Sequence, residues 1–321
     1  MVIRRTRTTW RGPRAAWVTA ALAALALCLP GPMTAASQDT EPVLTISYEA
    51  YPVAGLDSPN TQPVNGAPNF EEALRVREKR LAADFSAPIL RGSTRTALLA
   101  LFGYRRYDLD LEHWSESQGG RPIKSPQVFE AGVSFRRRLT SGWLMRIDFL
   151  PGLHSDFEGQ VGLGDLRFRG GMVFERTLKD DLHVTLGAGY TLAFGRGYPL
   201  PRVGVRWMMA SNVLVDLMLP ERAALWYVPG ERVAFGVATA VTGGSHHGDP
   251  DLYRVADPET RVATGTLGPS LIVRATDHVR LRLDSGVTFF RSLALYDGGD
   301  EVRSLDPKRT TFVRATAEIW R

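Results

Sequence analysis

The chain has 321 residues and carries a formal net charge of +5 at neutral pH. This excess lies in the first 36 residues, which hold no acidic side chain and five arginines: Arg4, Arg5, Arg7, Arg11 and Arg14. The remainder is formally neutral and has no basic cluster interleaved with aromatic residues, which excludes a nucleic-acid partner. The only cysteine is Cys28. Lipid attachment there would need a small residue just before it, and Leu27 is not small, so a lipoprotein is the less favoured alternative. The remainder therefore has no disulfide and no thiolate metal ligand.

The N-terminus has the three parts of a secretory signal peptide. The arginines precede an apolar stretch at 15–29 that is terminated by prolines, and small residues follow at 34–36. A transmembrane helix would need about 20 apolar residues, which is more than this stretch supplies. We therefore expect residues 1–36 to be a signal peptide that is cleaved near Ala36, and residues 37–321 to form one exported domain.

Apolar and polar residues alternate along several later segments, which predicts β-strands with one apolar and one polar face. In chain order, the clearest alternating rows lie at 129–136, 145–149, 165–172 and 279–289. A tilted strand needs about 9 to 11 residues to cross a bilayer, whereas ordinary strands average about 5 or 6. Several segments are long enough to cross: 94–111, 127–139, 182–194 and 279–291.

Short and long connections alternate between these segments. The short ones lie at 91–93, 140–142, 177–181, 210–212, 229–231 and 276–278. The long ones lie at 52–79, 112–126, 151–163, 243–261 and 292–308. Outer-membrane barrels have tight turns at one end and long loops at the other. The pattern therefore predicts an all-β fold, a transmembrane antiparallel up-and-down β-barrel of about fourteen strands, with about twelve as the alternative because two segments are short.

A sheet can span hydrocarbon only if it closes on itself, because every backbone polar group needs a partner there. One row of each strand then faces lipid and the other faces the lumen. An arginine on the lipid face near the midplane would cost about 2 to 4 kcal/mol, so the charged rows are expected to face inward. The candidate lumen-lining residues are Arg106, Asp108, Asp110, Glu130, Arg136, Arg146, Asp148, Asp165, Arg167, Arg169, Arg202, Arg206, Arg280, Arg282 and Asp284.

Together with the N-terminal signal, two motifs carry a family resemblance. One is GLGDLRF at 162–168, and the other is PRVGVRW at 201–207, which LMLP follows at 217–220. The chain resembles bacterial families of outer-membrane β-barrels of unknown function. The resemblance implies a location in the cell outer membrane, with membrane lipid and the barrel-assembly machinery as partners, and it implies no known activity.

Two clusters in expected outer loops contain the residue types of a hydrolase: His-Ser-Asp at 154–156 and Ser-His-His at 245–247, with Asp249 nearby. Adjacent residues rarely converge into a catalytic triad, and the chain has no Gly-x-Ser-x-Gly motif. The two histidines at 246–247 could also bind a transition metal with Asp249 or Asp251, although solvated side chains are the simpler interpretation. We therefore expect no enzyme activity, no cofactor and no metal.

The favoured function is passive passage or uptake of a small-molecule solute, or a structural role in the membrane. Two alternatives from other classes stay open at this point. One is an outer-membrane lipid hydrolase with serine and histidine at the barrel rim. The other is a soluble periplasmic β-sandwich that binds a ligand.

Overall fold

The computed structural model describes residues 42–55, 75–93, 95–112, 125–140, 142–157, 161–248, 257–304 and 306–320. The expected signal peptide at 1–36 and the acidic residues Asp249 and Asp251 lie outside these ranges. The described residues fall within the compact unit Glu41–Arg321. Within them, no helix is both long enough and apolar enough to cross a membrane.

The described residues form one sheet and one short helix. The strands are β1 (Leu44–Gly55), β2 (Arg75–Ser93), β3 (Thr96–Glu112), β4 (Gln127–Arg138), β5 (Trp143–Ser155), β6 (Leu166–Lys179), β7 (Leu182–Thr191), β8 (Tyr198–Ala210), β9 (Val213–Leu219), β10 (Arg222–Tyr227), β11 (Val233–His247), β12 (Pro258–Thr276), β13 (Val279–Asp297), β14 (Asp300–Ser304) and β15 (Thr311–Ile319). A 3₁₀ helix, η2 (Leu163–Asp165), precedes β6.

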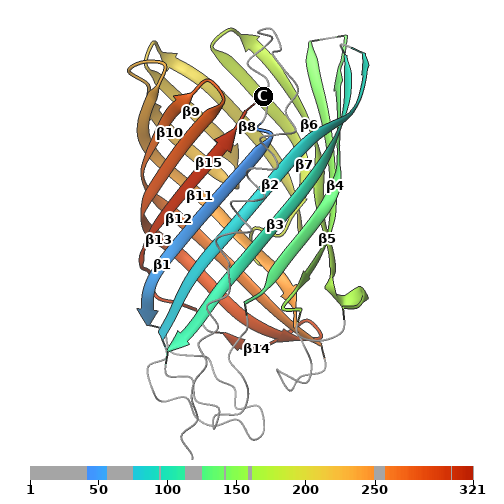
Figure 1. Ribbon diagram of the computed structural model, residues 1–321, viewed down its shortest axis with the longest axis vertical. Helices are drawn as coiled ribbons and strands as arrows, with labels where there is room; N and C mark the ends of the chain where they lie inside the picture. Colours follow the sequence, from blue (N-terminus) through green and yellow to red (C-terminus); the bar gives the residue numbers. More distant parts are fainter. Residues whose placement is uncertain are drawn as a thin grey trace, which may run out of the picture. The chain divides into compact units, whose positions relative to one another are not determined.

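The sheet closes into a barrel (Figure 1). Each strand from β1 to β13 pairs antiparallel with the next, and β15 pairs with both β13 and β1. Within the described residues β14 pairs only with β13, so it stands outside a closed ring of fourteen strands. The predicted all-β antiparallel barrel, with fourteen strands as the favoured number, is confirmed.

Burial in the barrel is reversed relative to a soluble protein. Large apolar side chains are exposed around the wall, among them Phe102, Phe149, Phe168, Leu186, Val203, Leu225, Val237, Leu271, Leu283 and Val313. Charged side chains on the opposite rows are buried, such as Glu130 and Asp284, each 4% exposed. Water would penalise such an apolar exterior, whereas a bilayer accepts it. The alternative of a soluble β-sandwich is therefore wrong.

The two ends of the barrel differ in their connections. At the short-turn end, neighbouring strands are joined by segments such as 180–181, 211–212 and 277–278. At the long-loop end, several strands continue into regions that the sequence assigned to loops: β2 begins at Arg75, β5 runs to Ser155, β11 runs to His247 and β12 begins at Pro258. The sequence interpretation ended these strands too early because it followed apolar alternation, which stops where strands pair outside hydrocarbon.

Strands β9 and β10 are short, with only 7 and 6 residues, so the barrel wall extends less far there toward the long-loop end. Their registers leave 198–202 of β8 and 242–247 of β11 without a strand partner on the side of this hairpin. The end of β11 instead reaches β5, where His247 pairs with Ser155 in a parallel bridge. The long-loop end of the barrel is therefore narrowed by a direct contact between strands that are not neighbours in the ring.

Candidate functional site in the barrel lumen

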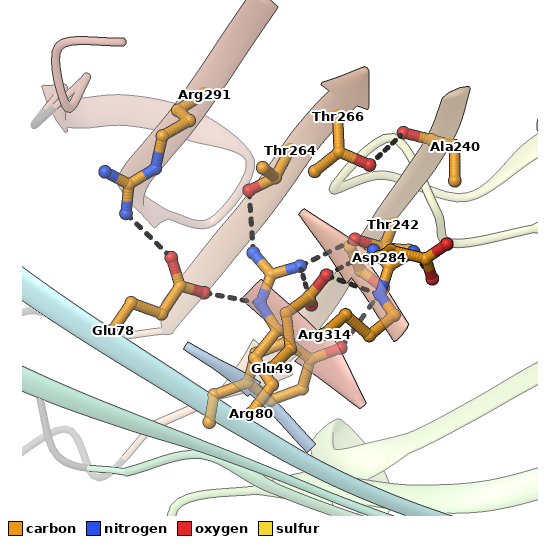
Figure 2. A network of polar contacts seen from close by, with 12 residues as sticks. Glu49, Glu78, Arg80, Ala240, Thr242, Thr264, Thr266, Asp284, Arg291 and Arg314 are labelled. Atoms are coloured by element: carbon orange, nitrogen blue, oxygen red, sulfur yellow. Dashed lines mark hydrogen bonds and ion pairs between the residues drawn. The ribbon is translucent and has the colours of Figure 1, made fainter. Parts of the chain in front are cut away.

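The side chain of Arg80 crosses the lumen (Figure 2). It extends from β2, and its Nε donates to Glu78 Oε1 at 2.6 Å. Its two terminal nitrogens donate to Thr242 Oγ1 on β11 at 2.6 Å and to Thr264 Oγ1 on β12 at 2.7 Å. Four strands, β1, β15, β13 and β12, separate β2 from β11 in the ring. The guanidinium therefore joins separate parts of the wall across the interior.

Further buried charges extend this contact into what we call the Arg80 network. Arg291 on β13 donates to Glu78 Oε2 at 2.9 Å, and both side chains are almost completely buried. Glu49 on β1 lies 3.5 Å from Arg80 and accepts from Arg314 Nε at 2.7 Å. A buried charge is costly unless it is paired and hydrogen-bonded. The network meets this condition by alternating charges of opposite sign around the lumen.

A second group of charges, the Glu130 network, lies on β2, β3, β4 and β6. Glu130 accepts hydrogen bonds from Arg105 and from Arg169, whose Nε lies 2.7 Å from Oε1. Asp84 lies 2.8 Å from Arg105 and 3.6 Å from Arg169, so it balances the same two guanidinium groups. His154 Nε2 lies 3.6 Å from Glu130 Oε1. The two arginines and two carboxylates thus link two pairs of neighbouring strands, β2 with β3 and β3 with β4, and two pairs that are farther apart, β4 with β6 and β2 with β6.

A cavity of about 360 Å³ borders both networks. Its charged lining comprises Glu49, Arg80, Asp84, Arg105, Arg106, Glu130, Asp148, Arg169, Arg202, Glu221 and Arg314. Arg202 and Glu221 form another ion pair, at 2.9 Å, at the tip of the short β9–β10 hairpin. Both signs of charge therefore face the cavity, and the opposite charges lie close enough to neutralise one another.

Most of the expected lumen-lining residues lie on strand rows opposite to the exposed apolar side chains. These are Glu130, Arg136, Arg146, Asp148, Arg167, Arg169, Arg202, Arg206, Arg280, Arg282 and Asp284. Asp165 lies in η2 instead of a strand and is buried, with its Oδ2 accepting from the Gly162 backbone at 2.7 Å. Of these residues, the structure brings four to the cavity: Glu130, Asp148, Arg169 and Arg202. It places Asp284 at 3.9 Å from Arg314.

The β3 candidates Arg106, Asp108 and Asp110 are the exception. They share a strand row with Phe102, whose side chain is 50% exposed. Arg106 borders the lumen cavity beside the inward Arg105, but its Nε pairs with Asp108 of the outward row at 2.7 Å. The inward cation on β3 is Arg105, which sequence reasoning missed because both rows of this segment carry charges. Continuing the apolar row from Phe102 along the strand would have identified the correct phase.

The sequence also missed Glu78 and Arg80, because they fall at the edge of a segment that was assigned to a long loop. Arg80 alternates with Leu81, and Leu81 belongs to the apolar row that continues through Ala83 and Phe85. Extending that row toward the N-terminus places Glu78 and Arg80 on the inward face. The signal was therefore present in the register of β2.

The two serine–histidine clusters lie largely on strands and are buried. Ser245 Oγ donates to Glu259, and Ser155 Oγ accepts from the Phe157 backbone. The rings of His154 and His246 stack with centroids 5.9 Å apart. Among the described residues, no hydrogen bond joins their ring nitrogens to a partner. In the described part of the chain, neither serine thus has the histidine partner that an activated nucleophile requires.

His247 occupies a different environment, at the bridge between β11 and β5. Its Nδ1 lies 3.3 Å from Asp165 Oδ1, and its Nε2 lies 3.1 Å from Asp257 Oδ1. We call these three side chains the His247 clamp. No group of three or more His, Cys, Asp or Glu side chains among the described residues could hold a metal ion.

Solved structures similar to this one include several membrane barrels. The COG4313 outer membrane channel from Pseudomonas putida F1 has 8% identity and a TM-score of 0.44, and the match covers 90% of this chain and 100% of the other. Outer membrane phospholipase A from Escherichia coli has 10% identity and a TM-score of 0.35, with 89% and 94% covered. The KdgM porin in complex with oligogalacturonate has 10% identity and a TM-score of 0.32, with 86% and 98% covered.

No curated protein matches the chain significantly. A family model does match, over residues 114–299, which is more than half of the sequence. This range contains the cavity-lining Arg169 and Arg202, the short β9–β10 hairpin and the His247 clamp. The chain belongs to the family described as Domain of unknown function (DUF6268).

Proposed function

We propose that this protein is an outer-membrane channel for small polar solutes, with a lumen that the Arg80 network holds largely closed. The observation that carries the proposal is the cavity of about 360 Å³, lined by charged residues, inside a closed barrel with an apolar exterior. A barrel of this size has room for more than its own side chains. The paired charges also stabilise the wall, so it is the cavity beside them that favours a channel over a purely structural barrel.

The chemistry of the lining supports a solute that is polar and has no strong charge preference. The cavity faces arginines that are paired with carboxylates, such as Arg202 with Glu221 and Arg105 with Glu130. Paired charges create a weak net field but offer many hydrogen-bond donors and acceptors. We therefore propose that the candidate lumen-lining residues on the inward rows serve as contacts for a hydrated small molecule.

A hydrolytic function receives less support from the same geometry. Ser245 donates to Glu259, and the nearby ring of His246 packs against Tyr107 with centroids 4.8 Å apart. This arrangement stabilises the wall without presenting a nucleophile to a substrate. We propose that the protein is not an enzyme, that its lipid partner is the surrounding membrane, and that the barrel-assembly machinery inserts it after cleavage near Ala36.

Conductance of the purified protein in planar lipid bilayers tests the channel proposal. The wild type should show small conductance steps, and Arg80→Ala should enlarge them severalfold because it removes the contacts from β2 to Thr242 and Thr264. Arg274→Ala, at an exposed position near the short-turn end, is the matched control and should behave as the wild type. The proposal fails if neither the wild type nor Arg80→Ala conducts more than an empty bilayer.

A further inference from the structure

Three side chains at the short-turn end form a basic patch on neighbouring strands, which we call the Trp143 patch. They are Arg137 on β4, Trp143 on β5 and Arg176 on β6. Arg137 and Trp143 lie on either side of the connection between β4 and β5, and Arg176 lies near the end of β6 that leads into the turn at 180–181. The channel proposal makes no use of these residues.

The contacts of nearby residues on β5 show which face of the wall carries Trp143. Asp148 borders the lumen cavity, and Arg146 lies 3.3 Å from Asp148 on the same inward row. The alternate positions, Ile147 and Phe149, are 38% and 54% exposed. Side chains at every second position of a strand share one face. Trp143 therefore belongs to the row that faces away from the lumen.

The strand register places both arginines on the same outward face. Residues directly opposite one another in antiparallel strands project to the same side of the sheet. Arg176 lies opposite Trp143, and Arg137 lies opposite Met145, which is the next outward residue of β5. On β4, the row of Arg137 continues to Val133, whose side chain is 40% exposed. The two arginines thus flank β5 on the outer surface of the barrel.

Neither arginine has an acidic partner among the described residues. Arg137 and Arg176 are both exposed, and no ion pair involves either of them in that part of the chain. Glu175, the neighbour of Arg176 on β6, faces inward and lies 3.5 Å from Arg146. Arg176 instead lies over the Trp143 ring, with its Cζ 5.6 Å from the ring centroid. The hydrogen-bond donors of both guanidinium groups are therefore available to an anion.

The patch lies where the apolar outer surface of these strands gives way to polar residues. On β4, Phe129 and Val133 are exposed apolar side chains of the outward row, and Arg137 follows them toward the turn. Tryptophan is favoured at the level of the lipid head groups. Arginine near a strand end keeps its apolar stem against the protein surface and extends its charged end to the same level. We therefore place the patch at the boundary between hydrocarbon and head groups.

The spacing of the two arginines suits a single phosphate group. They are separated by two strand spacings and by two residues along β5, so their Cα atoms lie roughly 12 Å apart. Long side chains that approach from both sides reach the space above β5. Arginine matches phosphate well because its planar fork donates two parallel hydrogen bonds, and basic residues near the membrane surface attract anionic lipids.

We propose that the Trp143 patch binds the phosphate of an anionic membrane phospholipid, with Arg137 and Arg176 as its ligands. The Trp143 ring is a positioning group that holds Arg176 over β5. The acyl chains lie along the apolar side chains of the same outward rows, such as Val133 and Ile147. This inference goes beyond the channel proposal and does not depend on it, because the whole patch lies on the outer face of the wall.

Lipid retention by the intact protein tests this assignment. The protein is reconstituted into vesicles of equal parts phosphatidylcholine and phosphatidylglycerol, extracted with mild detergent, and examined by native mass spectrometry. The wild type should retain phosphatidylglycerol in preference to phosphatidylcholine. Arg137→Gln and Arg176→Gln should each retain about fivefold less phosphatidylglycerol, and the double variant about 25-fold less, because each substitution removes one charge near the membrane surface.

Arg274→Gln is the matched control. It removes the same charge at the same end of the barrel, from an exposed position on β12 opposite Arg280 of the inward row, and it should retain as much lipid as the wild type. Because Arg137 and Arg176 are exposed, their variants should still migrate as folded barrels before boiling. Their bilayer conductance reports separately on the channel.

Three results would overturn the proposal. Equal retention by the double variant and the wild type would remove both assigned ligands. An equal loss in Arg274→Gln would reduce the effect to general surface charge. Displacement of phosphatidylglycerol by millimolar inorganic phosphate would assign the patch to a free anion instead of a lipid.

Discussion

The half of the barrel toward the short turns and the half toward the long loops differ in how their side chains are buried. Toward the short-turn end, Leu281 and Leu283 of β13 face outward and alternate with Arg280 and Arg282. Toward the long-loop end, both rows of β12 are largely buried over 258–266. The first half is organised by the contrast between lipid and water. The second is organised by polar contacts across the lumen and by segments that pack on the wall.

Removing a buried charge from the long-loop half should lower the free energy of unfolding more than any other change considered. Glu78→Ala leaves Arg80 and Arg291 without their shared carboxylate. Loss of one partner from a buried pair costs about 3 to 5 kcal/mol, and urea unfolding in detergent or lipid measures it. Asp110→Ala is the control, because its pair with Arg77 is exposed at 3.9 Å and such pairs contribute little. Equal stability of the two variants would mean that the Arg80 network does not stabilise this half.

A charge on the lipid-facing surface should destabilise the short-turn half of the barrel. Leu283→Arg introduces a cation at an outward position that is 48% exposed, within the alternating part of β13. Near the midplane this costs about 2 to 4 kcal/mol, whereas near the interface the cost falls to about 0 to 1. Met209→Arg, close to the turn at 211–212, provides that interfacial comparison. Unfolding in lipid vesicles should show a larger loss of stability for Leu283→Arg than for Met209→Arg. Equal losses would contradict a lipid-facing row at Leu283.

The same contrast explains how far the sequence could predict the molecule. The inward direction of Arg280, Arg282 and Asp284 could be predicted because leucines occupy alternate positions between the charged residues. In the long-loop half, no such alternation of apolar residues indicates which row faces inward. Ser245 and His246 are adjacent and both buried, so no alternation marks β11 as a strand there. The Arg80 network depends on strands that are distant in sequence, and periodicity within one strand carries no information about such contacts.

The His247 clamp gives the smallest expected effect and the finest comparison between the halves. The imidazole lies 3.3 Å from Asp165 and 3.1 Å from Asp257. These contacts join the end of β11 to η2 and to the residue before β12, beside the bridge from His247 to Ser155 of β5. The His247 side chain is 20% exposed, but that of Asp257 is 65% exposed, and contacts at such exposed positions contribute little.

His247→Ala should accordingly raise the conductance about twofold to fivefold, because it removes two contacts of about 0.2 to 1 kcal/mol each that hold β11 near β5. His183→Ala, near the short-turn end, also removes a histidine that contacts a neighbouring strand, and it should leave the conductance unchanged. Planar-bilayer recordings of both variants measure the difference. If His247→Ala conducted no more than the wild type, closure at the long-loop end would have to depend on other groups, and the lumen networks alone would distinguish the two halves.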